Sequence, residues 1–374
     1  MKISSSQSVS CRVALGGLGV LVSLLGSVPG AAAQGLAGAQ VHSAPAPMQL
    51  AQATGARPSA NAVQAEVDAL IKAAKAEGEV TFYFSLVEST AKRVADGFTA
   101  KYGIKAQFVR APSTATLLRY ASEAEAGNFS ADLMFVGGSL DFGRDGVAKG
   151  WLEPIAQAGI PVVRSGEFPA RFNLGPAATV TLTPWLVAFN SDKVKGADVP
   201  KDWNALLNPK FDGQILIADP RSSDAYVPFW VALYDAYGEQ YFTRLRALNI
   251  RQYKSGIPAA QGMAAGEGSF TIPAIAATVL ALKLKGAPVG MLTPDFTVGV
   301  ETNIFMTARG KAKRPNAARL FAHYTMSPDG NTVFNAEDGA VSVYDNGGLP
   351  KQYKSPTLES MARKDLITRL LGFQ

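Results

Sequence analysis

Cysteine and histidine, the side chains on which many enzymes and metal sites depend, are nearly absent from this sequence. The 374 residues include one cysteine, Cys11, and two histidines, His42 and His323. Because no cysteine follows residue 33, that part of the chain has no disulfide, no thiolate metal site and no cysteine nucleophile. A Ser–His pair or a histidine-rich metal site is hard to build from so few imidazoles, and His323 beside Leu320 and Tyr324 is expected to be a packing or surface residue. We therefore predict a protein without catalytic residues, cofactor or resident metal.

Charged and aromatic side chains are also sparse. Only 18% of the residues are charged and 9% are aromatic, and the formal net charge is +6 with both signs interspersed. A nucleic-acid-binding protein carries a dense basic stripe, which this composition does not supply. A hydrophobic fraction of 47% is enough for a sizeable core and argues against disorder. We expect a folded protein that binds no nucleic acid.

The amino-terminal segment has the pattern of a secretory signal. Two basic residues flank a serine-rich start, residues 13–28 carry no charge, and Ala31-Ala32-Ala33 has the small-x-small pattern that signal peptidase recognises. A membrane-spanning helix needs about 20 apolar residues, so this run is short for one, although a retained anchor is the alternative. We predict a signal peptide over 1–33 and a periplasmic location, followed by a flexible leader over 34–60 that is rich in Ala, Gln, Gly, Pro and Ser.

Strand-like and helix-like patterns alternate from residue 61 onward. Amphipathic helical spacing alternates with short runs of β-branched and aromatic residues, which predict strands at 80–85, 104–110, 132–136, 186–190, 214–218, 269–272, 289–292 and 298–306. This alternation predicts an α/β fold in which helices cover both faces of the sheets. Because the alternation breaks and then resumes, we predict lobe 1 from 61–182 plus 300–374 and lobe 2 from 184–296. Two crossing strands join the lobes as a hinge.

Polar loops follow the predicted strands and lead into helices. Open α/β sheets bind ligands at the carboxyl ends of their strands, where exposed N–H groups and the positive ends of helices suit anions. Arg221 adds a planar guanidinium suited to a carboxylate or phosphate, and Trp185 at the predicted hinge stacks on a ligand or anchors the core. Each loop taken singly also has the composition of an ordinary helix cap. The candidate ligand-binding residues of these loops are Ser85, Glu88, Ser113, Gly138, Ser139, Trp185, Arg221, Ser222 and Ser223.

Several short motifs occur in an informative order between roughly residues 78 and 345. They are Val80-Thr81-Phe82-Tyr83, the runs 94–99, 102–105 and 131–135, Trp151-Leu152-Glu153-Pro154, Asn208-Pro209-Lys210-Phe211, Gly266-Glu267, and Ser327-Pro328-Asp329-Gly330-Asn331. Together they resemble the periplasmic ferric-ion-type solute-binding proteins. The resemblance implies a two-lobed fold similar to type II periplasmic binding proteins of ABC importers, with two mixed sheets flanked by helices and joined by two crossing strands.

One departure from this family concerns the metal. Iron-binding members carry an adjacent tyrosine pair after the strand that follows the Gly-Glu step, and counting on from Gly266-Glu267 reaches Ala276-Ala277 here. Phenolate oxygens suit Fe³⁺, and alanine has no donor atom, so ferric binding is not expected. The same count places residues 271–274 against the cleft, which makes Thr271 a further candidate ligand-binding residue.

The resemblance and the polar loops together predict capture of a small organic solute by hinge closure. Arg221 with Ser222 and Ser223 favours an anion, phosphorylated, phosphonate or carboxylate. A cationic solute would instead need carboxylates such as Glu88. The expected partner is an inner-membrane ABC permease, and the protein is expected to be a monomer. Ferric or other metal transport, an exported hydrolase on a similar two-domain frame, and a binding protein that serves a receptor remain alternatives.

Overall fold

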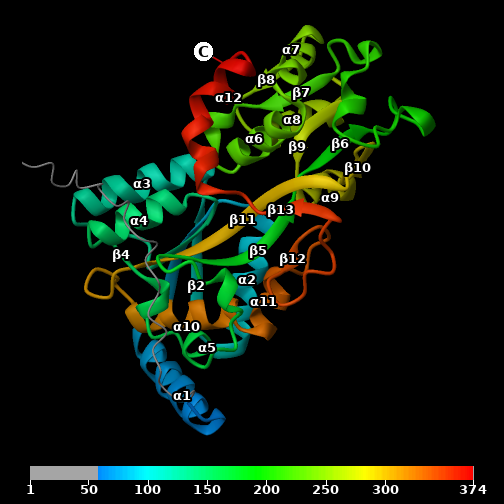
Figure 1. Cartoon of the computed structure of the whole chain (residues 1–374). Helices are drawn as coiled ribbons and strands as arrows, with labels where there is room; N and C mark the ends of the chain where they lie inside the picture. The colour runs from blue at the N-terminus through cyan, green and yellow to red at the C-terminus, as the bar shows by residue number, and fades with distance from the viewer. Residues whose placement is uncertain (1–57, 374) are drawn as a thin grey trace, which may run out of the picture. The chain divides into compact units, whose positions relative to one another are not determined.

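Two sheets, each covered by helices, organise the residues that the computed structural model describes, 58–373 (Figure 1). The α-helices are α1 (Ala60–Glu77), α2 (Glu88–Tyr102), α3 (Ser113–Glu125), α4 (Leu140–Ala148), α5 (Pro161–Arg164), α6 (Tyr226–Tyr237), α7 (Glu239–Ala247), α8 (Gly256–Ala264), α9 (Ala276–Leu284), α10 (Pro315–Met326), α11 (Pro328–Phe334) and α12 (Lys364–Leu370). Short 3₁₀ helices are η1 (Ile155–Gln157), η2 (Ala170–Phe172), η3 (Gly196–Asp198), η4 (Asn204–Leu207), η5 (Pro209–Phe211), η6 (Pro220–Ser222) and η7 (Leu358–Arg363). The predicted signal peptide and leader, as far as residue 57, lie outside the described residues.

The strands of the two sheets in the described residues are β1 (Glu79–Phe84), β2 (Lys105–Arg110), β3 (Leu133–Gly137), β4 (Leu152–Glu153), β5 (Ala178–Pro184), β6 (Leu186–Asn190), β7 (Ile215–Ala218), β8 (Arg251–Tyr253), β9 (Phe270–Ala274), β10 (Val289–Leu292), β11 (Phe296–Thr307), β12 (Val341–Ser342) and β13 (Gln352–Lys354). Eight of these strands lie close to predicted positions, whereas β4, β5, β8, β12 and β13 were not predicted. The first sheet has the order β12-β5-β11-β3-β1-β2, with β4 and β13 also paired to β11, and the second has the order β10-β6-β9-β7-β8.

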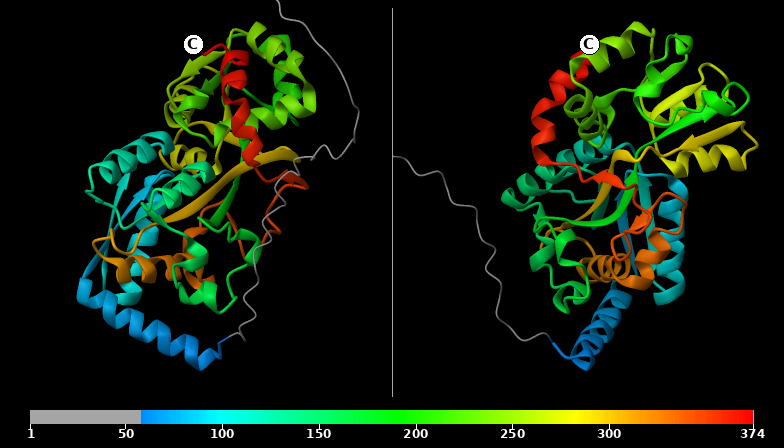
Figure 2. Two further views of the ribbon diagram at one scale, coloured as in Figure 1. Left: turned by 60° about the vertical axis from the view of Figure 1, so that its left-hand side comes forward. Right: turned by 45° about the vertical axis from the view of Figure 1, so that its right-hand side comes forward.

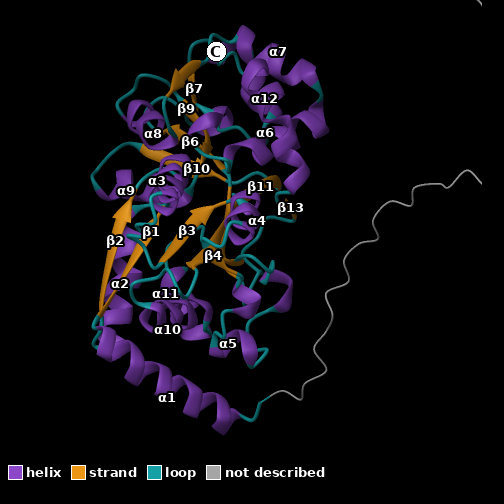
Figure 3. Ribbon diagram, turned by 90° about the vertical axis from the view of Figure 1, so that its left-hand side faces the viewer, coloured by secondary structure: helices purple, strands orange, loops and turns teal. Residues whose placement is uncertain are grey.

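Each sheet combines parallel and antiparallel pairs. In the first sheet, β1 is parallel to β2 and β3, while β11 is antiparallel to β3 and β5. In the second sheet, β7 is parallel to β8 and β9, while β6 is antiparallel to β9 and β10. Figure 3 shows helices on the faces of these strands. The prediction of an α/β fold with two mixed sheets is confirmed, and no described helix is long and apolar enough to cross a membrane.

Helices of the first sheet end where glycine permits a reversal of the chain. α1 ends at Gly78, whose φ of 81° lies in the left-handed region, and its N–H donates to the Ala74 carbonyl oxygen. α2 ends in the same way at Gly103, whose N–H donates to Thr99 O. A side chain at either position would strain this conformation. In the sequence, the apolar helical spacing of residues 63–74 and of residues 91–102 is followed by these two glycines, which predicts both helix ends.

Three segments connect the halves of the molecule that the sequence predicted as lobe 1 and lobe 2. The β5–β6 connection passes through Trp185, and the long strand β11 is the second connection (Figure 1). The third, which the sequence analysis did not anticipate, runs from β13 through η7 to α12. We use lobe 1 for the first sheet with α1–α5, α10 and α11, and lobe 2 for the second sheet with α6–α9 and α12.

The carboxyl-terminal tail differs from the expected boundary, which assigned all of 300–374 to lobe 1. The side chains of Ile367, Leu371 and Phe373 belong to the hydrophobic core of lobe 2, and the Leu371 carbonyl accepts a hydrogen bond of 3.0 Å from Gln252 Nε2. Figure 2 shows this red helix alongside the green helices of lobe 2. The tail buries too few apolar residues for its sequence to indicate which core they cover.

The sequence pattern of residues 201–208 predicts a helix that starts at Lys201 and ends at Asn208, but no α-helix forms there. The segment instead contains the 3₁₀ helix η4, and the Asp202 side chain accepts a hydrogen bond from the backbone N–H of Ala205. Pro209 then starts the next short helix, η5. Proline at this point leaves too few residues for a stable α-helix, so the shorter turn forms instead.

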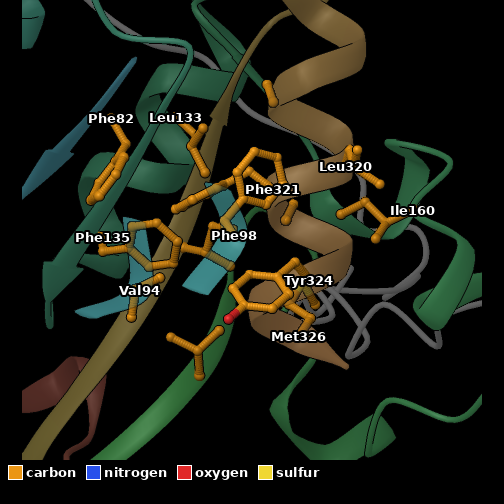
Figure 4. Close-up of a cluster of buried hydrophobic side chains, with 14 of the residues drawn as sticks. Phe82, Val94, Phe98, Leu133, Phe135, Ile160, Leu320, Phe321, Tyr324 and Met326 are labelled. Atoms are coloured by element: carbon orange, nitrogen blue, oxygen red, sulfur yellow. The ribbon is translucent and has the colours of Figure 1, made fainter. Parts of the chain in front are cut away.

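The core of lobe 1 contains a cluster of aromatic rings around Phe321 of α10 (Figure 4). The ring centroid of Phe321 lies 4.8 Å from that of Phe82 and 4.8 Å from that of Phe98. Phe135 on β3 contacts the same ring at 5.9 Å. All four side chains are fully buried. The helix is therefore fixed to the sheet by interlocking rings.

His323, on the same helix, is a packing residue as predicted. Its imidazole is largely buried, which lowers its pKa from 6.5 to about 4, and the charge of Lys101 acts in the same direction. The unfolded chain binds a proton near pH 6.5 and the folded chain only near pH 4, so stability falls as the pH falls through this window. We expect the melting temperature of His323→Gln to decrease less between pH 7 and pH 5 than that of the wild type. His42→Gln serves as the control, and equal slopes for all three proteins would contradict the assignment.

Candidate functional site

A cavity of about 330 Å³ lies where the carboxyl ends of parallel strands from both lobes meet. Its walls come from the loops after β1, β2 and β3, from the crossing segments, and from the loops after β7, β8 and β9. We call it the interlobe cavity, and its lining residues are Ser85, Leu86, Val87, Arg110, Pro112, Ser113, Gly137, Thr183, Trp185, Ser222, Ser223, Ala225, Tyr226, Ser255, Gly256, Ile257, Pro258, Pro273, Ala274, Ile275, Thr278 and Val300. Its size is within the range of about 300–1,000 Å³ usual for ligand pockets.

Helix amino termini converge on this cavity. The N-cap positions of α2, α3, α6, α8 and α9 all line it, and they are Val87, Pro112, Ala225, Ser255 and Ile275. At none of these positions does the N-cap side chain accept a hydrogen bond from its own helix. Ordinary side-chain capping therefore does not explain these helix starts. The backbone N–H groups and the positive ends of the helix dipoles favour an anion at this place.

Arg110, the last residue of β2, supplies a cation to the cavity wall. Its Nε donates a hydrogen bond of 2.8 Å to the Leu86 carbonyl oxygen, which fixes the direction of the guanidinium. Burial lowers its pKa, while the charge of Glu88 acts in the opposite direction. No described carboxylate lies within 4.0 Å of its charged nitrogens. A half-buried guanidinium without an ion-pair partner is suited to bind an anionic group of a ligand.

Hydroxyl groups form hydrogen bonds between the two lobes beside the cavity. Ser223 Oγ of lobe 2 donates to Ser113 Oγ of lobe 1 at 3.2 Å, and Thr114 Oγ1 donates to the Arg221 carbonyl oxygen at 3.1 Å. Ser85 Oγ accepts a hydrogen bond from Gly137 N at 3.1 Å, and Ser222 Oγ donates to Asp219 O at 2.8 Å. The cavity is therefore bounded by direct contacts between the lobes.

Trp185 and Tyr226 form a stacked pair in the cavity wall near the crossing strands. Their ring centroids are 5.2 Å apart with an interplanar angle of 25°. Tyr226 OH accepts a hydrogen bond of 3.1 Å from Gly256 N, and burial raises the pKa of the phenol to about 12. Tyr226 is therefore neutral at physiological pH. Trp185 is part of the core of lobe 2 and also lines the cavity, and its stacking on a ligand stays a prediction.

The predicted ligand-binding residues separate into two groups. Ser85, Ser113, Trp185, Ser222 and Ser223 all line the interlobe cavity. The fold thus brings together residues that are as far apart as 138 positions in the sequence (223 minus 85). Alignment of parallel strand ends produces this convergence.

Arg221, by contrast, does not line the cavity. Its guanidinium contacts the Asp219 carboxylate through Nε and Nη2 at 2.8 to 3.1 Å, and it also lies 5.9 Å from the Phe373 ring. The Asp219 side chain holds the backbone as well, because it accepts a hydrogen bond of 2.8 Å from Arg221 N. The Arg221 side chain therefore stabilises the conformation of its own loop through its contacts with Asp219.

The remaining predicted residues lie around the cavity. Glu88, exposed at the start of α2, lines an outer hollow of about 290 Å³ that shares Arg110 with the interlobe cavity. Gly138 and Ser139 line a separate hollow of about 70 Å³, where Ser139 Oγ donates to Asp224 Oδ2 at 3.4 Å. Thr271 is buried within β9 and lines none of these hollows, although Pro273 and Ala274 of the same strand line the interlobe cavity.

Sequence reasoning missed several residues of the cavity, of which Arg110 and Tyr226 are the most polar. In the sequence, Arg110 has the pattern of a polar residue at the end of a strand. Its position directly before the polar loop 111–114 could have indicated that it lies near a ligand site. Tyr226 lies two residues beyond the loop 219–224. The loop that starts at Ser255 was missed because β8, with only three residues, has too short a pattern to be recognised.

The Ala276-Ala277 position lies at the start of α9, next to the cavity. Ala276 is buried against Gly339 of lobe 1 so closely that a Cβ atom on Gly339 would collide with it. Within residues 58–373, no three His, Cys, Asp or Glu side chains gather in a way that would hold a metal ion. The donors of a tyrosinate iron site are thus missing from this corner.

Comparisons with known proteins agree with this architecture. Residues 133–359, more than half of the chain, match the family described as bacterial extracellular solute-binding protein. An uncharacterized protein of Haemophilus influenzae is 26% identical over 281 residues, which cover 73% of this chain and 80% of that protein. Three similar solved structures are the fructose-6-phosphate-bound periplasmic binding protein AfuA of Actinobacillus pleuropneumoniae, an ABC transporter substrate-binding protein of Agrobacterium tumefaciens and iron-bound HitA of Pseudomonas aeruginosa.

The structural similarities extend over most of each chain. AfuA has a TM-score of 0.59 and 24% identity, and the match covers 79% of this chain and 96% of that chain. The Agrobacterium protein has a TM-score of 0.66 and 17% identity, and the match covers 78% of this chain and 94% of that chain. HitA has a TM-score of 0.60 and 17% identity, and the match covers 79% of this chain and 99% of that chain. At these identities the similarity establishes the fold.

Two mixed sheets, three connecting segments and a cavity at facing strand ends define a two-lobed binding protein. The chain belongs to the bacterial extracellular solute-binding protein family. The predicted resemblance and the predicted extracellular or periplasmic location are thereby confirmed. The family binds solutes and is not enzymatic, which removes the exported-hydrolase alternative.

Proposed function

We propose that this protein captures a small organic anion in the interlobe cavity and delivers it to an ABC importer. The observation that carries the proposal is Arg110, a half-buried guanidinium with no ion-pair partner among the described residues, in a cavity ringed by helix amino termini. Of the described residues that line this cavity, none is Asp or Glu. A carboxylate, phosphonate or phosphate group would therefore be attracted by Arg110 and the helix amino termini, with Glu88 of the adjoining hollow as the acidic side chain that acts on Arg110.

Closure of the hinge couples binding to delivery. A ligand in the interlobe cavity would contact loops of both lobes, and such contacts exist only when the lobes are close together. The Ser113–Ser223 and Thr114–Arg221 hydrogen bonds are of this interlobe kind. A closed, ligand-bound protein is the form that an inner-membrane permease would recognise. The Agrobacterium structure, described as part of an ABC transporter, supports this partner by analogy of fold.

A thermal-shift screen tests the class of solute. Ligands that bind only the folded protein raise the melting temperature by mass action. We expect increases from members of a panel of carboxylates, phosphonates and phosphate esters and none from polyamines at the same concentration. Isothermal titration calorimetry then gives the affinity of each positive compound. Stabilisation by polyamines alone would contradict an anionic solute.

Iron binding is the alternative that the similarity to iron-bound HitA raises. Because alanines occupy positions 276 and 277, we expect a sample incubated with ferric citrate and then desalted to remain colourless. A tyrosinate–Fe³⁺ site would instead absorb visible light. A visible band that disappears with a chelator would show that the chain holds iron through other donors and would favour the metal-transport alternative.

A further inference from the structure

The uncharged walls of the interlobe cavity limit the kind of group that can be attached to the anionic group of the solute. Apart from Arg110, the polar side chains that line it are serine and threonine hydroxyls and the ring atoms of Trp185 and Tyr226. The described lining residues include no Asp, Glu, Asn, Gln, His or Lys. A sugar presents many hydroxyls, each of which needs a donor or acceptor once water is removed. A carboxylate or amide side chain can bind two sugar hydroxyls at once, and the described lining residues include none.

Several hydroxyls in the cavity wall are also engaged within the protein. Ser222 Oγ donates its proton to Asp219 O, and Ser223 Oγ donates to Ser113 Oγ while it accepts from Ala225 N at 3.3 Å. A hydroxyl that has given its one proton cannot donate to a ligand as well. Ser222 and Ser223 therefore have no proton left for a ligand, whereas Tyr226 OH and Ser85 Oγ accept backbone N–H groups and keep their protons. The side chains of the wall thus offer a polyol separate hydroxyls but no carboxylate or amide that could bind two of its hydroxyls at once.

The end of the cavity nearest the crossing strands is mainly apolar and aromatic, and its polar groups are the Thr183 hydroxyl and the indole N–H of Trp185, which has no hydrogen-bond partner among the described residues. Trp185 and Val300 lie on the crossing segments, and Pro273 comes from the end of β9. Tyr226 stacks on Trp185 there. Arg110 instead lines both the interlobe cavity and the outer hollow, so it lies at the junction of the two. The cavity therefore has a cationic side at its junction with the outer hollow and an apolar side at the hinge.

We infer that the solute is an amphipathic organic anion, with a carboxylate or phosphonate group at Arg110 and an apolar or aromatic body against Trp185, Tyr226 and Val300. This inference depends on the proposed anion-binding function and narrows it. An apolar body gains by leaving water and needs no hydrogen-bond partner in the wall. A sugar phosphate, by contrast, would recover only part of the hydration of its hydroxyls, because no Asp, Glu, Asn or Gln side chain is among the described lining residues.

Calorimetry with matched probes tests the inference. We expect phenylphosphonate to bind at least tenfold more tightly than inorganic phosphate, glucose 6-phosphate and fructose 6-phosphate, and phenylacetate to bind at least tenfold more tightly than acetate. Benzyl alcohol, which has the ring without the charge, is expected to give no measurable heat. Binding of either sugar phosphate as tightly as phenylphosphonate would overturn the apolar body while it left the anion proposal intact. Binding of benzyl alcohol as tightly as phenylacetate would overturn the anion proposal itself.

A substitution in the apolar wall gives an independent test. Val300→Thr keeps the shape of the side chain but places a hydroxyl in the wall, so we expect about tenfold weaker binding of phenylphosphonate and unchanged binding of inorganic phosphate. Val298→Thr is the matched control, because Val298 lies two residues earlier on the same strand, is buried, and does not line the cavity. Circular dichroism melting of both variants separates loss of binding from loss of fold. Equal loss of phenylphosphonate affinity in the two variants would overturn the assignment of the wall.

Discussion

Arg110→Gln is expected to weaken binding of an anionic solute by about 30- to 700-fold. The guanidinium is half-buried in the cavity wall and oriented by the Leu86 carbonyl, so an anion paired with it would be largely shielded from water. Truncation of one partner of such a charged hydrogen-bonded pair costs about 2–4 kcal/mol, and each 1.4 kcal/mol is a factor of ten in affinity. Glutamine keeps a polar N–H group near the position of Nε and removes the positive charge together with the outer part of the guanidinium. Calorimetry with phenylphosphonate provides the measurement.

Arg221→Gln is the matched control for this experiment. Arg221 has the same side chain, belongs to a loop next to the same cavity, and contacts Asp219 outside the cavity lining. We expect its loss to change the affinity by less than about threefold, since it removes a partly exposed ion pair. If Arg221→Gln abolished binding and Arg110→Gln did not, the anion would bind at the sequence-predicted residue, and the role given to Arg110 would be wrong.

Phe321→Ala is expected to lower the free energy of unfolding by about 3–5 kcal/mol. Its ring is fully buried and contacts the rings of Phe82, Phe98 and Phe135, so its removal leaves a cavity that the packed core cannot refill (Figure 4). Denaturant titration followed by circular dichroism measures the change, and a separate loss of lobe 1 would appear as a second transition.

Leu118→Ala provides the control for the core substitution. Leu118 lies on α3 of the same lobe, but its side chain is 66% exposed. An exposed leucine has little apolar contact to lose, so the change is expected to remain within about 0.5 kcal/mol. If Phe321→Ala and Leu118→Ala destabilised the protein equally, the ring cluster would not be the main support of α10.

The cavity illustrates which parts of a binding site a sequence can indicate. Ser85, Ser113, Ser222 and Ser223 were found because they occupy loops at the ends of strongly patterned strands, and parallel strand ends must meet. The sequence indicated Arg221 because it lies beside two serines, and it did not indicate Arg110 at all. The sequence also contains Asp219 two positions earlier, which allows the local ion pair that the structure shows. Whether an arginine faces a cavity or a neighbour in its own loop depends on side-chain direction, which sequence spacing does not specify.

The carboxyl-terminal tail shows the same limit at the level of the fold. Its helix was not predicted, and its apolar residues Ile367, Leu371 and Phe373 pack into lobe 2 although the preceding residues belong to lobe 1. The hydrophobic effect depends on the apolar area that is buried and does not depend on the position of a segment in the sequence. A short apolar segment at the end of a chain can therefore cover either core.

The sequence by itself determined the α/β class, the positions of the main strands, the helix ends at Gly78 and Gly103, and the scarcity of reactive side chains. These depend on local periodicity, backbone freedom and composition, which each segment carries alone. The tertiary structure alone decided that Arg110 rather than Arg221 lines the cavity, that Trp185 stacks on Tyr226, and that the tail joins lobe 2. Those outcomes depend on contacts between residues far apart in the chain, and only packing in three dimensions selects among the contacts that the sequence permits.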